Sequence, residues 1–192
     1  NQAEVTHVYS ATGTYTIKIS GTIRGWKFNA GGDCLKILDI SAWGDFNFTN
    51  ERSFRNCTNL TSSATDIPTI SSANMSWTFV NCYYVNPLMD NWDMSGVTDM
   101  TGMLGQCSAF NQDLSSWDIS LVTAFSFFAS NTTMSTANYD ALLRGWEALS
   151  VQAFQQPNFG NATYTGGGVV ATARANLIAA PNNWTITDGG IA

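Results

Sequence analysis

The chain has 192 residues, of which 44% are apolar and 11% are charged, and its formal net charge is −6. A chain of this length can bury a sizeable core as one cooperative unit. The excess of acidic residues argues against nucleic acid as a partner, because phosphate binding needs clustered Lys and Arg, and no apolar run is long enough for membrane insertion.

Residues 1–48 are predicted to form an N-terminal β cap and lead-in. The run 14–19 is rich in β-branched and aromatic residues and is bounded by glycines, which indicates a strand. Residues 22–28 suggest a second strand and 34–40 a third. The chain opens on Asn1 without a leader sequence, so we interpret it as a piece of a longer secreted protein.

Residues 49–132 contain a repeat of 25 residues. Cys57, Cys82 and Cys107 stand at this spacing, and other residues align at the same step: Phe54 with Phe79 and Leu104, Met75 with Met100 and Phe125, and Trp92 with Trp117. A period of this length is typical of solenoids, in which each coil buries its apolar side against its neighbours.

The three repeated cysteines are expected to stack inside the coils as a structural ladder. We favour reduced thiols, since free Cys behaves as a small buried hydrophobe, although adjacent coils are close enough for a disulfide. A zinc site is not expected, because the chain has no CxxC pair and only one histidine, His7.

Residues 133–192 are predicted to form a C-terminal α/β cap. Apolar residues at helical spacing predict helices over 137–149 and 169–179. Residues 184–187 suggest a short closing strand. The proposed caps of the first helix are Thr136 or Asn138.

This cap should bury Trp146 and Trp184 against the last coil, since the end of a solenoid needs a cover. The predicted fold class is therefore α+β with repeats: a short leucine-rich-repeat-like solenoid of 25-residue coils between an N-terminal β cap and a C-terminal α/β cap.

The repeat resembles a known family. Its clearest copies are Trp92-Asp-Met-Ser-Gly-Val-Thr98 and Trp117-Asp-Ile-Ser-Leu-Val-Thr123. They are similar to the repeat of BspA-like bacterial surface proteins, a domain of uncharacterised function that is abundant in mycoplasma surface proteins. The copy between Cys57 and Cys82 departs from it, with Ile67-Pro68 in place of the Trp-Asp pair. The resemblance implies an extracellular or cell-surface bacterial location and an adhesion role without a catalytic site.

The residues themselves give no sign of an enzyme or of a cofactor. No nucleophile, phosphate-binding or zinc-protease motif is present. Asp93 and Asp118 recur at the repeat step, and a role in accepting backbone N–H bonds at a turn explains them better than catalysis. No Lys or Arg lies between Cys57 and Leu143, which makes an acidic edge. We interpret this edge as solvated surface and expect no metal site, with calcium or a basic ligand as the alternative.

The candidate ligand site lies where the repeat is broken. Tyr83 and Tyr84 replace small polar residues of the sister coils, and Trp77 stands where another coil has glycine. Tyr and Trp offer flat contact area with a polar tip, which suits sugar rings and protein hot spots. Asp90 and Asn91 could supply hydrogen bonds at the same edge.

Two structural alternatives stand beside this site. One of the two tyrosines could turn inward to fill a gap. Trp77 is expected to pack in the core, because Phe127 shares its repeat position.

Three functions remain open from the sequence. The favoured one is a non-catalytic adhesion or recognition domain that binds a glycan or a protein on another cell surface, as at the tip of a fibre. The second is a structural spacer or assembly module, with a homotrimer through an N-terminal shaft as one form. The third and weakest is a carbohydrate-active enzyme.

Overall fold

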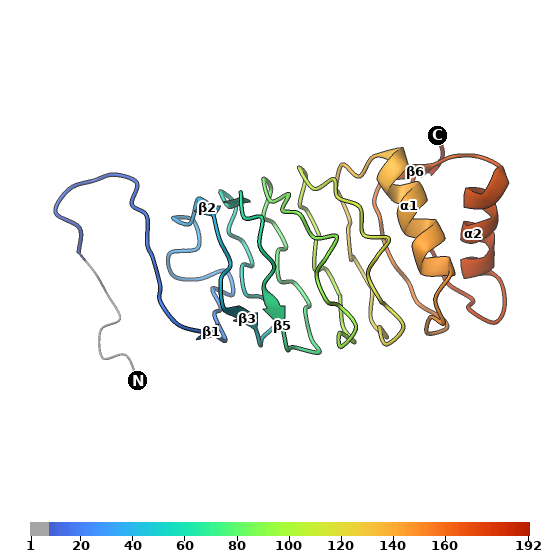
Figure 1. Ribbon diagram of the computed structural model, residues 1–192. Coiled ribbons are helices and arrows are strands. Elements are labelled where there is room, and N and C mark those ends of the chain that lie inside the picture. Colours follow the sequence, from blue (N-terminus) through green and yellow to red (C-terminus); the bar gives the residue numbers. More distant parts are fainter. Residues whose placement is uncertain (1–7) are drawn as a thin grey trace.

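A computed structural model describes residues 8–192 and shows a row of chain turns stacked side by side, with two helices at the C-terminal end (Figure 1). Every strand is two or three residues long. In chain order the elements are β1 (Ile23–Arg24), β2 (Asp39–Ile40), β3 (Phe46–Phe48), β4 (Thr61–Ser62), β5 (Thr69–Ile70), α1 (Thr136–Glu147), β6 (Thr163–Tyr164), α2 (Gly168–Ile178) and β7 (Gly190–Ile191).

All strand pairing is parallel, as stacked turns of one direction require. One sheet has the order β1-β3-β5, a second pairs β2 with β4, and a third pairs β6 with β7. Beyond β5 the first sheet continues as single bridges from Asn74 to Asp99 and from Asp99 to Ala124. Neighbouring turns therefore meet at residues separated by about one repeat.

Backbone hydrogen bonds between turns extend well beyond these strands. The amide of Phe79 donates to the carbonyl of Met103 at 2.9 Å, and the amide of Leu104 donates to the carbonyl of Phe128 at 2.8 Å. The amide of Phe54 makes the same bond to Thr78 at 2.9 Å. Because buried amides need partners, this ladder allows irregular backbone to pass through the interior.

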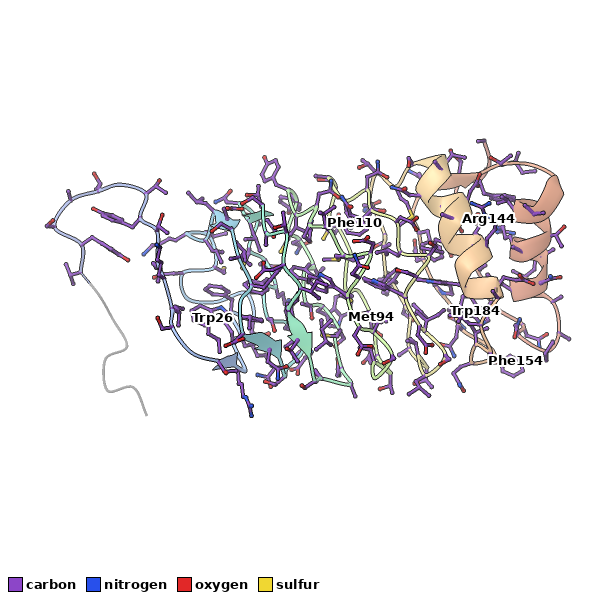
Figure 2. The ribbon with its side chains drawn as sticks, in the orientation of Figure 1. Trp26, Met94, Phe110, Arg144, Phe154 and Trp184 are labelled. Carbon is purple, nitrogen blue, oxygen red and sulfur yellow. The ribbon has the colours of Figure 1, made fainter. Side chains whose placement is uncertain are left out.

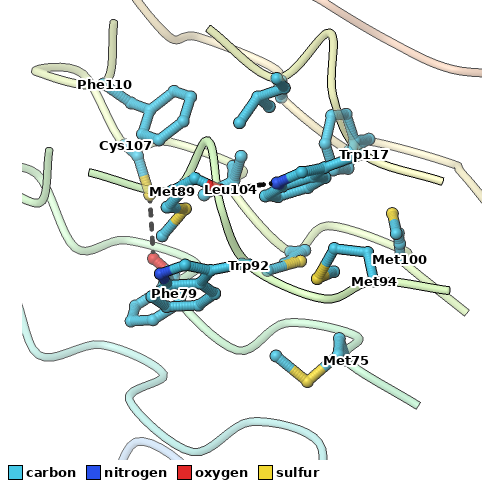
Figure 3. Close-up of a cluster of buried hydrophobic side chains, with 14 of the residues drawn as sticks. Met75, Phe79, Met89, Trp92, Met94, Met100, Leu104, Cys107, Phe110 and Trp117 are labelled. Carbon is cyan, nitrogen blue, oxygen red and sulfur yellow. Dashed lines mark hydrogen bonds between the residues drawn. The ribbon is translucent and has the colours of Figure 1, made fainter. Parts of the chain in front are cut away.

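Apolar columns run through the middle of the stack (Figure 3). The rings of Phe54 and Phe79 lie parallel, with centroids 5.7 Å apart and planes 4° apart. Met75, Met100 and Phe125 form a second buried column. Each fully buried side chain of this size contributes about 1.5–3 kcal/mol relative to exposure, so the repeat step places the main stabilising groups.

Tryptophans link turns by hydrogen bonds as well as by packing. The indole N–H of Trp117 donates to the carbonyl of Met89 at 2.8 Å (Figure 3), and that of Trp146 donates to Leu114 at 3.0 Å. The indole nitrogen of Trp92 is buried without such a partner. The preceding turn is the one that carries Ile67-Pro68 in place of the Trp-Asp pair, so the regular contact is lost where the repeat is irregular.

The N-terminal region differs from its prediction. Residues 14–19 form no strand and are exposed along their whole length, and Figure 1 shows this segment running away from the stacked turns. Of the second and third predicted strands only the pairs Ile23–Arg24 and Asp39–Ile40 are observed. Residues 14–19 have no neighbouring strand, and β propensity forms a strand only where a partner satisfies its hydrogen bonds.

The two C-terminal helices are confirmed. Helix α1 turns Tyr139, Leu142, Leu143 and Trp146 towards the stack. Its cap is neither Thr136 nor Asn138 but Ser135, whose hydroxyl accepts the Asn138 amide at 3.3 Å. Within residues 8–192 no helix is long and apolar enough to cross a bilayer.

Residues 184–187 do not form the short closing strand that the sequence predicted. Residues 184–187 contain only one bridge, from Thr187 to Asn158, and the regular pairing is β6 with β7. Trp184 is buried as predicted, and Figure 2 places it beside the end of the stack. These pairings do not assign the turns to the leucine-rich-repeat class, which stays a prediction.

Candidate functional site

Tyr83 and Tyr84 occupy an exposed turn directly after Cys82. Their exposed fractions are 42% and 59%. The carbonyl of Tyr83 accepts the Ala109 amide at 2.9 Å and the Ser108 hydroxyl at 3.1 Å. The backbone is therefore fixed to the next turn while both rings face solvent, and neither tyrosine turns inward to fill a gap.

Asp90 and Asn91 are exposed and contact each other. The amide nitrogen of Asn91 donates to the Asp90 carboxylate at 3.0 Å, and the hydroxyl of Ser116 donates to the Asp90 carbonyl. Within residues 8–192 no hydrogen bond joins either residue to Tyr83 or Tyr84. The predicted polar and aromatic residues are therefore not linked by hydrogen bonds.

Trp77 lies at the surface, half-buried, rather than in the core. Its backbone is left-handed, with φ of 57°, and its indole covers Gly102 of the next turn. A Cβ at Gly102 would lie 2.9 Å from the indole Cδ2 and would overlap two further ring carbons. Glycine at this position is what allows the indole to lie flat across the neighbouring turn.

Phe127 extends this surface, although its sequence position suggested the core. Its exposed fraction is 57%, and its ring centroid lies 6.4 Å from that of Trp77, with the planes 32° apart. Within the described part of the chain the ring contact of Trp77 is with Phe127 and not with Tyr83 or Tyr84. The shared repeat position of Trp77 and Phe127 was the sequence signal that could have identified this surface, but it was interpreted as a core position.

A shallow hollow of about 280 Å³ reaches Ser126, the residue before Phe127 in the chain. It is lined by the turn Thr123–Ser126 and by Phe154, Gln155 and Gln156. Phe154 is 73% exposed, and Figure 2 shows it at the outer edge near Trp184. The sequence comparison did not single out Phe154, because it lies outside the regular repeat.

The repeated carboxylates act in turns, as predicted. Asp93 accepts the Ser95 hydroxyl at 2.6 Å and the Ser95 amide at 3.1 Å, and Asp118 accepts the Ser120 amide at 2.9 Å. The serine hydroxyl and then the amide lower the pKa of each carboxyl. Among residues 8–192 no three His, Cys, Asp or Glu side chains gather as a metal site, and His7 lies outside the described residues.

Cys57, Cys82 and Cys107 are buried free thiols, and Cys34, which was not assigned to the ladder, is buried and free as well. The thiol of Cys82 donates to the Phe54 carbonyl at 3.0 Å, and that of Cys107 donates to Phe79 at 3.1 Å (Figure 3). Burial raises the pKa of Cys34, Cys82 and Cys107, so these sulfurs stay protonated and unreactive.

One buried ionic cluster lies in the C-terminal region and has a structural explanation. Asp188 accepts the Tyr139 hydroxyl at 2.7 Å and the Arg174 guanidinium at 2.8 and 3.2 Å. Arg174 also lies 5.1 Å from the Tyr164 ring centroid. These contacts tie α1, α2 and the segment before β7 together.

Comparison with known proteins identifies a family. The model of a family described as "Mycoplasma protein of unknown function, DUF285" matches residues 48–165. No curated protein matches this chain. No solved structure matches it either.

Proposed function

Because the chain belongs to the DUF285 family, a Mycoplasma protein family of unknown function, we propose that it is a non-catalytic recognition domain of a bacterial surface protein. It would bind a glycan or a protein on another cell surface. The finer assignment to BspA-like proteins, with the turns as a leucine-rich-repeat-like solenoid, is part of the same proposal. The repeat step and the parallel stacking of turns support it.

The observation that carries the proposal is the set of large aromatic side chains on hydrogen-bonded turns. Phe127 and Tyr84 each expose more than half of their surface, while the backbone around them bonds to neighbouring turns. Aromatic residues on a rigid scaffold lose little conformational entropy on binding, which favours recognition.

Binding of the purified full chain to cultured animal cells tests this function. Fluorescently labelled protein should bind in a saturable manner, and unlabelled protein should compete. A panel of immobilised glycans and matrix proteins then identifies the ligand class. Absence of saturable binding to cells, glycans and proteins would contradict the proposal.

A second candidate, an assembly module, is favoured by the N-terminal end of the stack. Strands β1 and β2 are the outer strands of their sheets. In the segment 14–19, Ile17 is 71% exposed and Ile19 is 55% exposed. An unpaired parallel edge beside exposed apolar residues is a template for pairing with another chain.

Solution mass distinguishes the assembly module from a monomeric adhesin. Light scattering with size-exclusion chromatography would give a dimer or trimer for the full chain, and a weaker association after removal of residues 1–20, which takes away Ile17 and Ile19 but keeps β1 and β2. A monomeric full chain at high micromolar concentration argues against assembly through this end and leaves the recognition function standing.

A further inference from the structure

Left-handed backbone recurs in the stack at two series of positions, and the residue types differ between them. One series consists of Asn56, Asn81, Gln106 and Asn131. Asparagine tolerates this conformation best among non-glycine residues, so three of these four residues suit the backbone. The other series contains Arg52, Trp77, Gly102 and Phe127.

The aromatic residues of the second series oppose their backbone preference. Trp77 has φ of 57° and Phe127 has φ of 60°, and Phe154 of the following turn has φ of 62°. Bulky side chains are strongly disfavoured there, whereas Gly102, at φ of 58°, is not. Backbone strain of this kind persists where the surrounding structure enforces it and is concentrated at functional sites.

Burial does not explain Phe127 and Phe154 either. Phe127 and Phe154 leave most of their surface in water, so they contribute little to the core. We name Trp77, Phe127 and Phe154 the aromatic strip. Phe127 and Phe154 therefore add little to folding stability, whereas Trp77 packs half-buried over Gly102 and still leaves part of its indole at the surface.

The backbone holds the aromatic strip rigidly. The amide of Trp77 donates to Thr101 at 2.8 Å, that of Gly102 donates to Ser126 at 2.8 Å, and that of Phe154 donates to Asn182 at 2.7 Å. The ring contact of Trp77 with Phe127 then spans the turn of Gly102 between them. Two rings inclined by 32° form a shallow apolar platform on one side of the stack.

The hollow is lined by Phe154 of the aromatic strip and by Ser126, which precedes Phe127, and it carries no charged side chain. Ser126 and Gln156 are exposed and offer a hydroxyl and an amide, and the hollow is lined by no Lys, Arg, Asp or Glu. A platform of rings beside neutral donors and acceptors matches a ligand with apolar C–H faces and many hydroxyls. An anionic ligand would find no cation in the hollow and a chain of net charge −6.

We propose that the aromatic strip and the adjacent hollow bind a neutral oligosaccharide, an inference that rests on the proposed recognition function. Sugar rings would lie on Trp77 and Phe127, and their hydroxyls would bond to Ser126 and Gln156. Tyr83 and Tyr84, the pair predicted from the sequence, would lie outside this site.

The decisive variant is Trp77→Gly with Phe127→Gly. Gly102 shows that the turn accepts glycine with this backbone, so the melting temperature should change by only a few degrees. Binding to neutral oligosaccharides built from hexoses and N-acetylhexosamines, found on an array and measured by calorimetry, should weaken by about tenfold or more, as for hot-spot aromatics. Phe154→Ser is a second variant on a largely exposed side chain, and it should also weaken binding.

Two matched controls separate the strip from the rest of the surface. Arg52→Gly changes the same repeat position in a turn outside the strip, and Tyr83→Ser with Tyr84→Ser removes the other exposed aromatic pair. Both should retain full affinity for the neutral oligosaccharide. Loss of affinity in the tyrosine variant alone would place the site elsewhere and overturn the inference.

The outcomes distinguish this inference from the proposed function. Saturable cell binding that is unchanged in the strip variants overturns the neutral-glycan site and leaves recognition intact. Binding only to sialylated or sulfated glycans, or only to a protein, has the same consequence. Absence of binding to any cell, glycan or protein would contradict both the neutral-glycan site and the proposed recognition function.

Discussion

Asp66 illustrates how single side chains hold irregular turns in place. Its carboxylate accepts the Trp43 amide at 2.9 Å and the Gly44 amide at 2.6 Å, from the turn that precedes β3. The bond from Trp43, followed by the bond from Gly44, lowers the pKa of Asp66 below its ordinary value, although partial burial opposes the shift. Trp43 in turn packs edge-on against Trp92, with centroids 5.6 Å apart.

Replacement of Asp66 by Asn should destabilise the protein in a pH-dependent manner. A carboxyl with a lowered folded pKa contributes stability above its unfolded pKa of about 3.9, and this contribution is lost as pH falls through the folded value. Asp66→Asn should therefore lower the unfolding free energy by about 1 kcal/mol at pH 7. The difference from the wild type should shrink below about pH 4.

Denaturant titrations between pH 3 and pH 7 measure this difference. Asp45→Asn is the control, because the exposed Asp45 side chain makes no hydrogen bond within residues 8–192. A gap between Asp66→Asn and wild type that stays constant down to pH 3 would show that the charge of Asp66 is not what matters.

The sequence predicted residue positions in the core better than those at the surface. Cys57, Cys82 and Cys107 align at a fixed step, and their burial follows because every coil must fill the same interior space. Phe127 aligns with Trp77 equally well but points outward. Both residues have left-handed backbone, which turns their side chains outward. A tryptophan or phenylalanine in the sequence does not predict a left-handed φ.

At the scale of elements, α1 shows close contact between a helix and the stack. Gly145 lies within α1 and faces the backbone of Ser115, so that a Cβ there would lie 2.8 Å from the Ser115 Cβ and would overlap the Ser115 carbonyl oxygen. This close approach also brings the Trp146 indole within 3.0 Å of the Leu114 carbonyl.

Gly145→Ala should destabilise the protein, although alanine is the better helix former by about 1 kcal/mol. Overlap with fixed backbone should outweigh this gain and lower the unfolding free energy by about 2 kcal/mol. Thermal unfolding followed by tryptophan fluorescence provides the measurement. Gly96→Ala is the matched control, since a Cβ there meets no atom within 4 Å, and equal stability of the two variants would contradict the close-contact argument.

The helices were predictable as elements and the strands were not. Helical spacing of Leu142, Leu143 and Trp146 reports a local periodicity that α1 realises on its own. A strand needs a partner, and residues 14–19 have the composition of one without a neighbour to pair with. In the stack, by contrast, turns that lack the composition of a strand still make backbone hydrogen bonds to neighbouring turns.

Across the whole molecule, the two ends of the stack differ. At the C-terminal end Phe125 and Phe128 pack on Trp146 with centroids 5.5 and 5.8 Å apart, and Phe159 covers Phe128 at 6.0 Å. At the N-terminal end the segment 8–20 is exposed throughout and covers no comparable cluster. The need for a C-terminal cover was predictable from the repeat, because an apolar column cannot end in water.

Truncation after Asn131 should therefore cause the protein to aggregate. It removes Trp146 and Phe159, both buried, and exposes the rings of Phe125 and Phe128 as a continuous apolar face. We expect loss of a cooperative thermal transition and a rise in light scattering at micromolar concentration. Deletion of residues 1–20 is the control and should leave the transition within a few degrees of the full chain. A truncated chain that stays soluble and unfolds cooperatively would mean that the stacked turns are stable without their helical cover.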